Sequence, residues 1–220
     1  MKKIISLSLA GIMAASALTL TSCGGRVTSI ENPVGTYSMD YAGTTLNVFN
    51  WGEYISDGSE GSLDVNAAFE TLTGIKVNYM NYDSNESMYA KLKSGAVAYD
   101  IIIPSDYMIE RLINENMLRK LDLSKIDNYK YVDEQYKNQF FDETNEYSVP
   151  YNVGMVGLIY NTTMVEDPVT SWNAMWDERY TDNILTFNNP RDSFAIAQFL
   201  LGLDLNSTNT ADWDKAAEKL

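Results

Sequence analysis

The sequence has no histidine and only one cysteine, Cys23. Without histidine the chain lacks the side chain that most often shuttles protons near neutral pH and most often ligates transition metals. A single cysteine cannot form a disulfide within one chain and cannot build a zinc cluster of several thiolates. These absences exclude the common histidine-dependent and thiol-dependent enzymes, and we expect neither a cofactor nor a metal site.

Basic residues are also scarce, since 16 Lys and Arg stand against 30 Asp and Glu and give a net charge of −14. A surface of this sign repels the phosphates of nucleic acids, so no nucleic-acid partner is expected. Negative charge raises the local concentration of cations, but it also simply keeps a secreted protein soluble. Attraction of a cationic ligand and plain solubility therefore both remain open from composition alone.

The N-terminal residues follow the order of a bacterial export signal. Two basic residues, Lys2 and Lys3, precede an apolar run that is too short and too rich in Ala and Ser for a confident membrane span. The sequence LTSC at residues 20–23 then matches the lipobox cut by the lipoprotein signal peptidase. We expect residues 1–22 to be a signal peptide and Cys23 to carry a lipid that anchors the protein outside the cytoplasm, at a membrane facing the periplasm or the exterior.

Alternating strands and helices are predicted after a Gly/Ser/Thr/Asn-rich tether at residues 23–44. Apolar periodicity predicts a strand at 46–50, a helix at 63–73 that stops at Gly74, and a strand at 75–79. Alternation of this kind is typical of an α/β fold with a mostly parallel sheet covered by helices.

A second helix and a third strand continue this alternation. The helix is predicted over residues 84–95, with Asp83 and Glu86 at the spacing of a capping box. The apolar run at 101–103 is predicted to be a strand buried on both faces, as in the middle of a parallel sheet.

Two polar and aromatic segments follow strands of the predicted sheet. NWGEY, residues 50–54, follows the first strand, and PSDY, residues 104–107, follows the third. Ligands of open α/β sheets bind beyond the carboxyl ends of the strands, and the faces of Trp and Tyr attract cations. The segments therefore indicate a cation site. The alternative is that the rings pack in the core and that Glu53 simply faces water.

Four stretches, in order along the chain, resemble the polyamine-binding proteins of ABC importers. The resemblance implies the periplasmic-binding-protein type II fold, in which two α/β lobes close over a ligand. It implies a first lobe at residues 45–152 and the start of a second at 153–220, so the 220-residue sequence is expected to be a fragment. The four stretches are FNWGEYI, TGIKVNYMNYDSNESMYAKLKSGAVAYDIIIPSDY, YSVPYNVGMVGLIYN and TSWNAMWD.

The resemblance also implies a ligand site. It assigns aromatic, hydroxyl and acidic side chains from both lobes, and this chain has Asn189 where the family commonly has Asp. For Asp192 the alternative is that it only caps a helix beginning at Ser193. The implied ligand residues are Trp51, Glu53, Tyr54, Ser105, Tyr107, Asn189 and Asp192.

The function implied by the resemblance is capture of putrescine or spermidine by a monomer and delivery to the membrane permease of an ABC importer, without catalysis. One alternative keeps the fold but changes the ligand to another cationic amine, an amino acid or a ferric ion. Another class of function is glycoside hydrolysis, which uses two carboxylates and would place them on Glu53 and Asp106.

Overall fold

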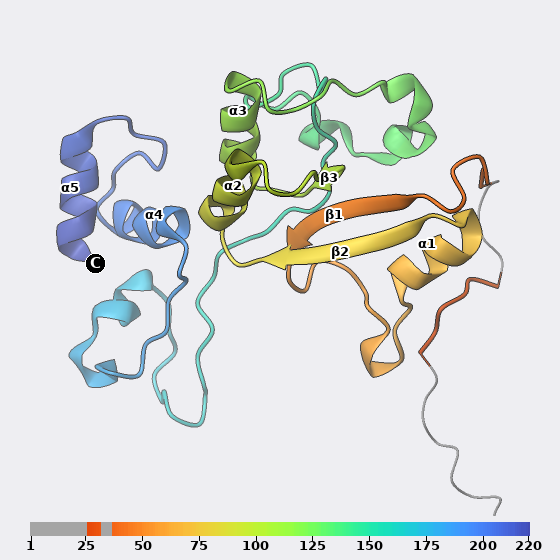
Figure 1. Ribbon diagram of the computed structural model, residues 1–220. Helices are drawn as coiled ribbons and strands as arrows, with labels where there is room; N and C mark the ends of the chain where they lie inside the picture. The colour runs from red at the N-terminus through yellow and green to blue at the C-terminus, as the bar shows by residue number, and fades with distance from the viewer. Residues whose placement is uncertain (1–25, 32–36) are drawn as a thin grey trace, which may run out of the picture. The chain divides into compact units, whose positions relative to one another are not determined.

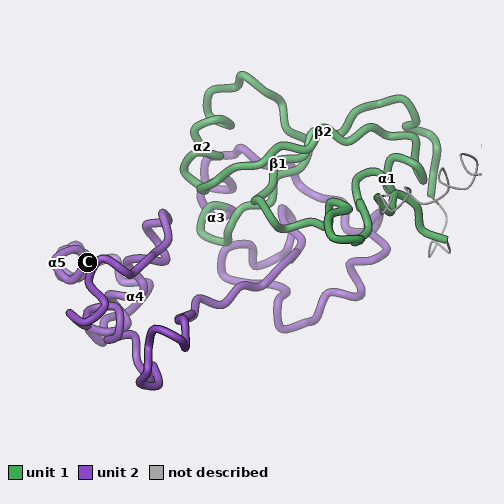
Figure 2. Tube along the Cα trace, turned by 90° about the horizontal axis from the view of Figure 1, so that it is seen from below, with its two compact units in different colours: residues 1–108 green, residues 109–220 purple. Residues whose placement is uncertain are grey.

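The structure is a computed structural model that describes residues 26–31 and 37–220. The predicted signal peptide and the predicted lipid site at Cys23 lie outside the described residues. Two compact units, Met1–Met108 and Ile109–Leu220, divide the chain (Figure 2). The predicted lobe boundary after residue 152 stays a prediction. Within the described ranges, no helix is long and apolar enough to cross a membrane.

The first unit contains a parallel sheet with strand order β2-β1-β3 (Figure 1). Its strands are β1 (Thr45–Trp51), β2 (Lys76–Tyr82) and β3 (Ile101–Ile102). Trp51 at the end of β1 lies opposite Tyr82 at the end of β2. The predicted α/β fold with a parallel sheet is thereby confirmed, although β2 runs three residues beyond its predicted end.

The third strand departs from its prediction. Ile101 is 46% exposed, so the expectation of a strand buried on both faces is wrong. The reason is position, since β3 pairs with β1 and ends the described sheet. The chain stays attached to β1 for one more residue, because the backbone N–H of Ile103 donates to the carbonyl of Phe49 at 3.0 Å.

Helices α1 and α2 of the first unit each begin at a polar cap. Helix α1 (Val65–Thr73) begins after Asp64, whose carboxylate accepts from the N–H of Ala67 at 3.0 Å. It ends at Gly74, whose φ of 69° favours glycine. Helix α3 (Asp106–Asn114) begins within the segment that follows β3, at Asp106.

The cap of helix α2 (Asn85–Ser94) is one residue from its predicted position. Ser84 is extended, and its hydroxyl accepts from the N–H of Ser87 at 3.1 Å. The predicted capping box of Asp83 and Glu86 is therefore wrong. With Ser84 as the cap, residues 85 and 86 lie in the first turn of α2, and their side chains reach the segment after β3.

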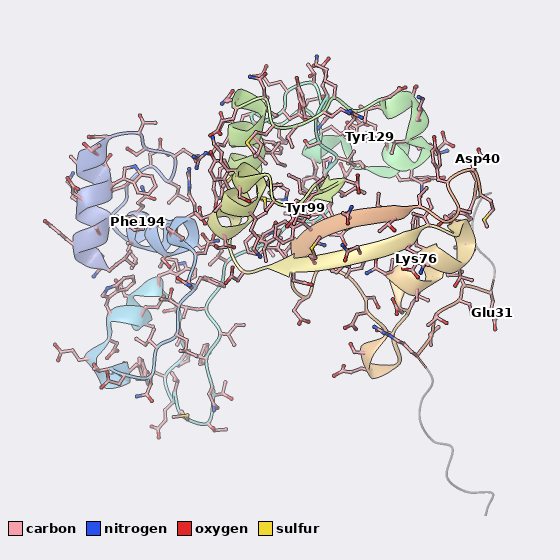
Figure 3. All side chains as sticks on the ribbon, viewed as in Figure 1. Glu31, Asp40, Lys76, Tyr99, Tyr129 and Phe194 are labelled. Atoms are coloured by element: carbon pink, nitrogen blue, oxygen red, sulfur yellow. The ribbon has the colours of Figure 1, made fainter. Side chains whose placement is uncertain are left out.

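The core of the first unit centres on Phe49 in β1, which is 1% exposed. The ring of Tyr99, labelled in Figure 3, stacks on Phe49 with centroids 4.4 Å apart. The ring of Tyr82 meets Phe49 edge-on at 4.9 Å. Met88 of α2 and Met108 of α3 are fully buried. This packing fixes the end of β1, and with it the start of the segment that follows.

The second unit contains two packed α-helices, α4 (Pro190–Leu200) and α5 (Thr210–Lys219). Phe194, labelled in Figure 3, lies with its ring 5.3 Å from that of Trp213. Ala197 of α4 and Ala216 of α5 are fully buried. Short 3-10 helices occur in both units, at Ser59–Gly61, Leu123–Lys125, Asp127–Tyr131, Glu134–Tyr136, Trp172–Trp176 and Glu178–Tyr180.

Candidate ligand-binding site

The carboxyl ends of all three strands lie at one edge of the sheet, because the strands are parallel (Figure 1). Trp51 ends β1, Tyr82 ends β2, and Ser105 follows β3. The rings of Trp51 and Tyr82 are in contact, with centroids 4.6 Å apart and planes tilted by 52°. This is the edge at which open α/β sheets bind ligands.

Tyr82 connects the segments that follow β1 and β3, and the sequence did not identify it. Its hydroxyl donates to the backbone carbonyl of Ile103. Burial raises the pKa of the Tyr82 hydroxyl, and the neighbouring phenols of Tyr54 and Tyr107 raise this pKa further. The group therefore stays neutral at physiological pH. Tyr82 lies three residues beyond the predicted end of the second strand, and its place opposite Trp51 follows from the register between β1 and β2.

The segment after β1 presents one more ring and a carboxylate. Tyr54 is 40% exposed, and its ring centroid lies 6.2 Å from that of Trp51. Glu53 is exposed and has a φ of 60°, in the left-handed region that residues other than glycine seldom adopt. The amide of Asn81 on β2 donates to the carbonyl of Trp51 at 3.0 Å and holds the segment against the sheet.

The segment after β3 is held by a buried amide. Asn85, at the start of α2, is 1% exposed. Its Nδ2 donates to the hydroxyl of Ser105 at 3.0 Å and to that of Tyr107 at 2.9 Å. Its Oδ1 accepts from the backbone N–H of Ser105 at 3.1 Å. The hydroxyl of Tyr107 in turn donates to the carboxylate of Glu86 at 3.1 Å.

The first unit thus brings together five of the seven predicted ligand residues around one strand edge. Sequence reasoning missed Asn85 and Glu86, which organise two of those five. Both lie within the SNES sequence that starts α2, so the predicted helix start placed them but gave no sign of their partners. The ligand role of the five residues stays a prediction.

The remaining two predicted residues lie in the second unit and contact each other. Asn189 caps α4, with its Oδ1 accepting from the N–H of Arg191 at 3.1 Å. Its Nδ2 donates to the carboxylate of Asp192 at 2.8 Å. The alternative in which Asp192 caps a helix beginning at Ser193 is wrong, because α4 begins at Pro190 and Asn189 is its cap.

A cavity of about 540 Å³ lies beside this strand edge. Gly52 and Glu53 line it, but Trp51, Tyr54, Ser105 and Tyr107 do not. The cavity already contains a cation, because the guanidinium of Arg26 lies 3.0 Å from the carboxylate of Asp64. We therefore place the candidate site at the aromatic strand edge rather than in this cavity. Across the part of the chain that the structure describes, no cluster of three or more Cys, Asp or Glu could hold a metal ion.

A parallel sheet whose strand ends present aromatic rings and polar groups is characteristic of an α/β ligand-binding domain. A family model described as bacterial extracellular solute-binding protein matches residues 65–220. The chain belongs to this family of transport proteins.

The relatives include a spermidine/putrescine-binding periplasmic protein of Salmonella typhimurium, which is 36% identical over 178 residues. That alignment covers 80% of this chain and 49% of the relative, so the chain spans about half of its length. A solved structure from Listeria monocytogenes, described as a putative spermidine/putrescine ABC transporter, is 40% identical with a TM-score of 0.74. It covers 80% of this chain and 53% of the solved one.

A solved lipoprotein of Treponema pallidum is 29% identical with a TM-score of 0.71, over 79% of this chain and 53% of that one. Together with the Listeria structure, it confirms the predicted solute-binding-protein fold. The chain corresponds to only part of each solved structure, in agreement with a second lobe that is incomplete in this sequence.

Proposed function

We propose that the complete protein captures a polyamine, putrescine or spermidine, outside the cytoplasm and delivers it to the permease of an ABC importer. The observation that carries the proposal is the contact of Trp51 with Tyr82 at the carboxyl edge of a parallel sheet, with Tyr54 beside them. The names of the Salmonella and Listeria relatives support the choice of polyamine.

The chemistry of the edge suits a flexible alkyl chain with ammonium groups. Ring faces pack against methylenes and attract ammonium groups, at about 0.5–2 kcal/mol per cation–π contact depending on desolvation. A carboxylate that accepts from an ammonium contributes about 1.5–3 kcal/mol. Glu53 in the first unit and Asp192 in the second are proposed as the countercharges. A net charge of −14 adds attraction at longer range.

In this proposal the protein binds and releases its ligand unchanged, as a monomer without a nucleic-acid partner. The two lobes, residues 45–152 and 153 onward, close over the polyamine, and the closed form is what the permease receives. Membership of a family of solute-binding transport proteins supports binding over catalysis.

A thermal-shift panel on the complete protein tests this function. Putrescine and spermidine are expected to raise the melting temperature, because a ligand that binds only the folded state stabilises it by mass action. An acidic amino acid and a neutral disaccharide serve as controls and are expected to have no effect. Stabilisation by the disaccharide, together with its hydrolysis, would favour the glycosidase alternative and contradict the proposal.

Membrane attachment through Cys23 is proposed separately, from the lipobox LTSC at residues 20–23. The Treponema relative, described as a lipoprotein, supports it. Metabolic labelling with a fatty-acid analogue is expected to mark the wild-type protein and to leave Cys23→Ser unmarked, because the sulfur of Cys23 is the atom to which the lipid is attached. Labelling of Cys23→Ser at the wild-type level would contradict the lipid anchor without affecting the proposed ligand.

A further inference from the structure

The buried amide of Asn85 has an orientation that chemistry fixes. Its Oδ1 faces the backbone N–H of Ser105, which can only donate. The opposite end must therefore be the amide nitrogen, which can only donate to the hydroxyls of Ser105 and Tyr107. At 1% exposure Asn85 has no room to exchange these partners for water.

The hydroxyl of Tyr107 is oriented by the same logic. It accepts from Asn85, so its own proton is available for another partner. That partner is the carboxylate of Glu86, 3.1 Å away, which as an anion can only accept. The hydrogen bonds are therefore all donated in one direction: Asn85 donates to Tyr107, and Tyr107 donates to Glu86. Any further group that approaches the phenol oxygen meets lone-pair density rather than a proton.

We propose that Asn85 is a positioning residue that, with Glu86, holds the Tyr107 hydroxyl as a hydrogen-bond acceptor for the N–H of an ammonium ligand. This inference rests on the proposed function and adds a source of selectivity to it. Donor ligands are accepted at Tyr107, and a ligand that offers only an acceptor, such as a carboxylate, is rejected there. Selection of a cation then depends on the Tyr107 oxygen being a hydrogen-bond acceptor as well as on negative charge.

The substitution Asn85→Asp distinguishes the effect of the hydrogen-bond orientation of Tyr107 from the effect of negative charge near the ligand. If negative charge alone governs binding, an added carboxylate beside the strand edge tightens the complex with a cation. Under the proposal binding weakens, because the new carboxylate accepts from the N–H of Ser105 but cannot donate to Tyr107. The single proton of Tyr107 would then be shared between two carboxylates, and its oxygen would lose the orientation that Asn85 gives it.

Calorimetry of the complete protein with spermidine and putrescine is the test. Asn85→Asp is expected to weaken binding about tenfold, near the lower end of what one hydrogen bond to a charged group contributes. Asn138→Asp adds the same charge at an exposed position and is expected to change binding by less than about twofold. In a Tyr107→Phe background, Asn85→Asp is expected to add less than about twofold, since both changes break one network.

A second variant covers the case in which Asn85→Asp does not fold. Glu86 is exposed, so Glu86→Gln is expected to fold. It should weaken binding about threefold in the wild type and leave it unchanged in the Tyr107→Phe background, as a network residue would. Glu31→Gln, which removes the same charge at another exposed position, is the matched control.

The outcomes separate this inference from the proposed function. Amine binding that Asn85→Asp tightens, or that Glu86→Gln weakens equally with and without Tyr107, overturns the inference and leaves polyamine capture intact. A wild-type protein that binds neither amine overturns both.

Discussion

Replacing Trp51 with alanine in the complete protein is expected to weaken polyamine binding by about 1–3 kcal/mol, or roughly 5- to 150-fold. The indole forms one wall of the aromatic edge, 4.6 Å from the ring of Tyr82 and 6.2 Å from that of Tyr54. Removing it takes away both the apolar surface for the methylenes and the ring face for an ammonium. Calorimetry with spermidine and putrescine measures the change.

Trp51→Phe is the control for the role of the ring face. It keeps an aromatic wall of smaller area and a weaker attraction for cations, so its loss should fall between those of wild type and Trp51→Ala. Circular dichroism should show both variants folded, because Trp51 is only partly buried. An unchanged dissociation constant in folded Trp51→Ala would remove the strand edge as the site.

Replacing Asp192 with asparagine is expected to weaken polyamine binding by about 1.5–3 kcal/mol while stability changes little. An ammonium buried without a countercharge is costly, and Asp192 is the acid that the second unit offers at the start of α4. The fold should tolerate the change because Asn189 is the cap, and an amide oxygen at position 192 can still accept from the Nδ2 of Asn189.

Asn189→Asp is the partner variant. Aspartate is as good a helix cap as asparagine, but the hydrogen bond from Nδ2 to Asp192 would become a contact between two carboxylates. We expect a lower melting temperature without ligand and tighter binding of spermidine, since the cation relieves the repulsion. Asp192→Asn that binds both amines as tightly as wild type would show that the second unit recognises its ligand elsewhere.

The parallel sheet was predictable because its signals are local. Alternating or continuous apolar residues marked β1, β2 and β3, and Gly74 marked the end of α1. The error over β3 has the same origin, because local sequence signals do not report on neighbouring strands. Burial of β3 depends on how many strands flank it, and a period in the sequence carries no information about neighbours.

The predicted site residues were found by their place after strands and by family resemblance, not by their contacts. The hydrogen bonds of Asn85 join residues 20 and 22 positions apart, and no spacing rule for helices or strands covers such pairs. The alternative that Asp192 only caps a helix could be excluded only by the structure, because Asn189 and Asp192 are both good caps and the backbone decides between them.

An apolar stretch in the second unit shows that apolar composition alone does not predict a strand. Met155 and Ile159 are 96% and 97% exposed in a stretch without regular secondary structure, although their sequence is apolar enough for a strand. A strand forms only against a neighbour, and within the described residues this stretch has none. Apolar composition is compatible with a strand, but it does not show whether a neighbouring strand is present.

A crystal structure of the complete protein grown with spermidine would show directly whether a polyamine binds at the carboxyl ends of the strands. We expect the alkyl chain to lie against the ring of Trp51, an ammonium N–H to point at the oxygen of Tyr107, and Asp192 to supply a countercharge. Spermidine bound away from the carboxyl ends of the strands, for example in the cavity lined by Arg26, Gly52 and Glu53, would contradict the proposal.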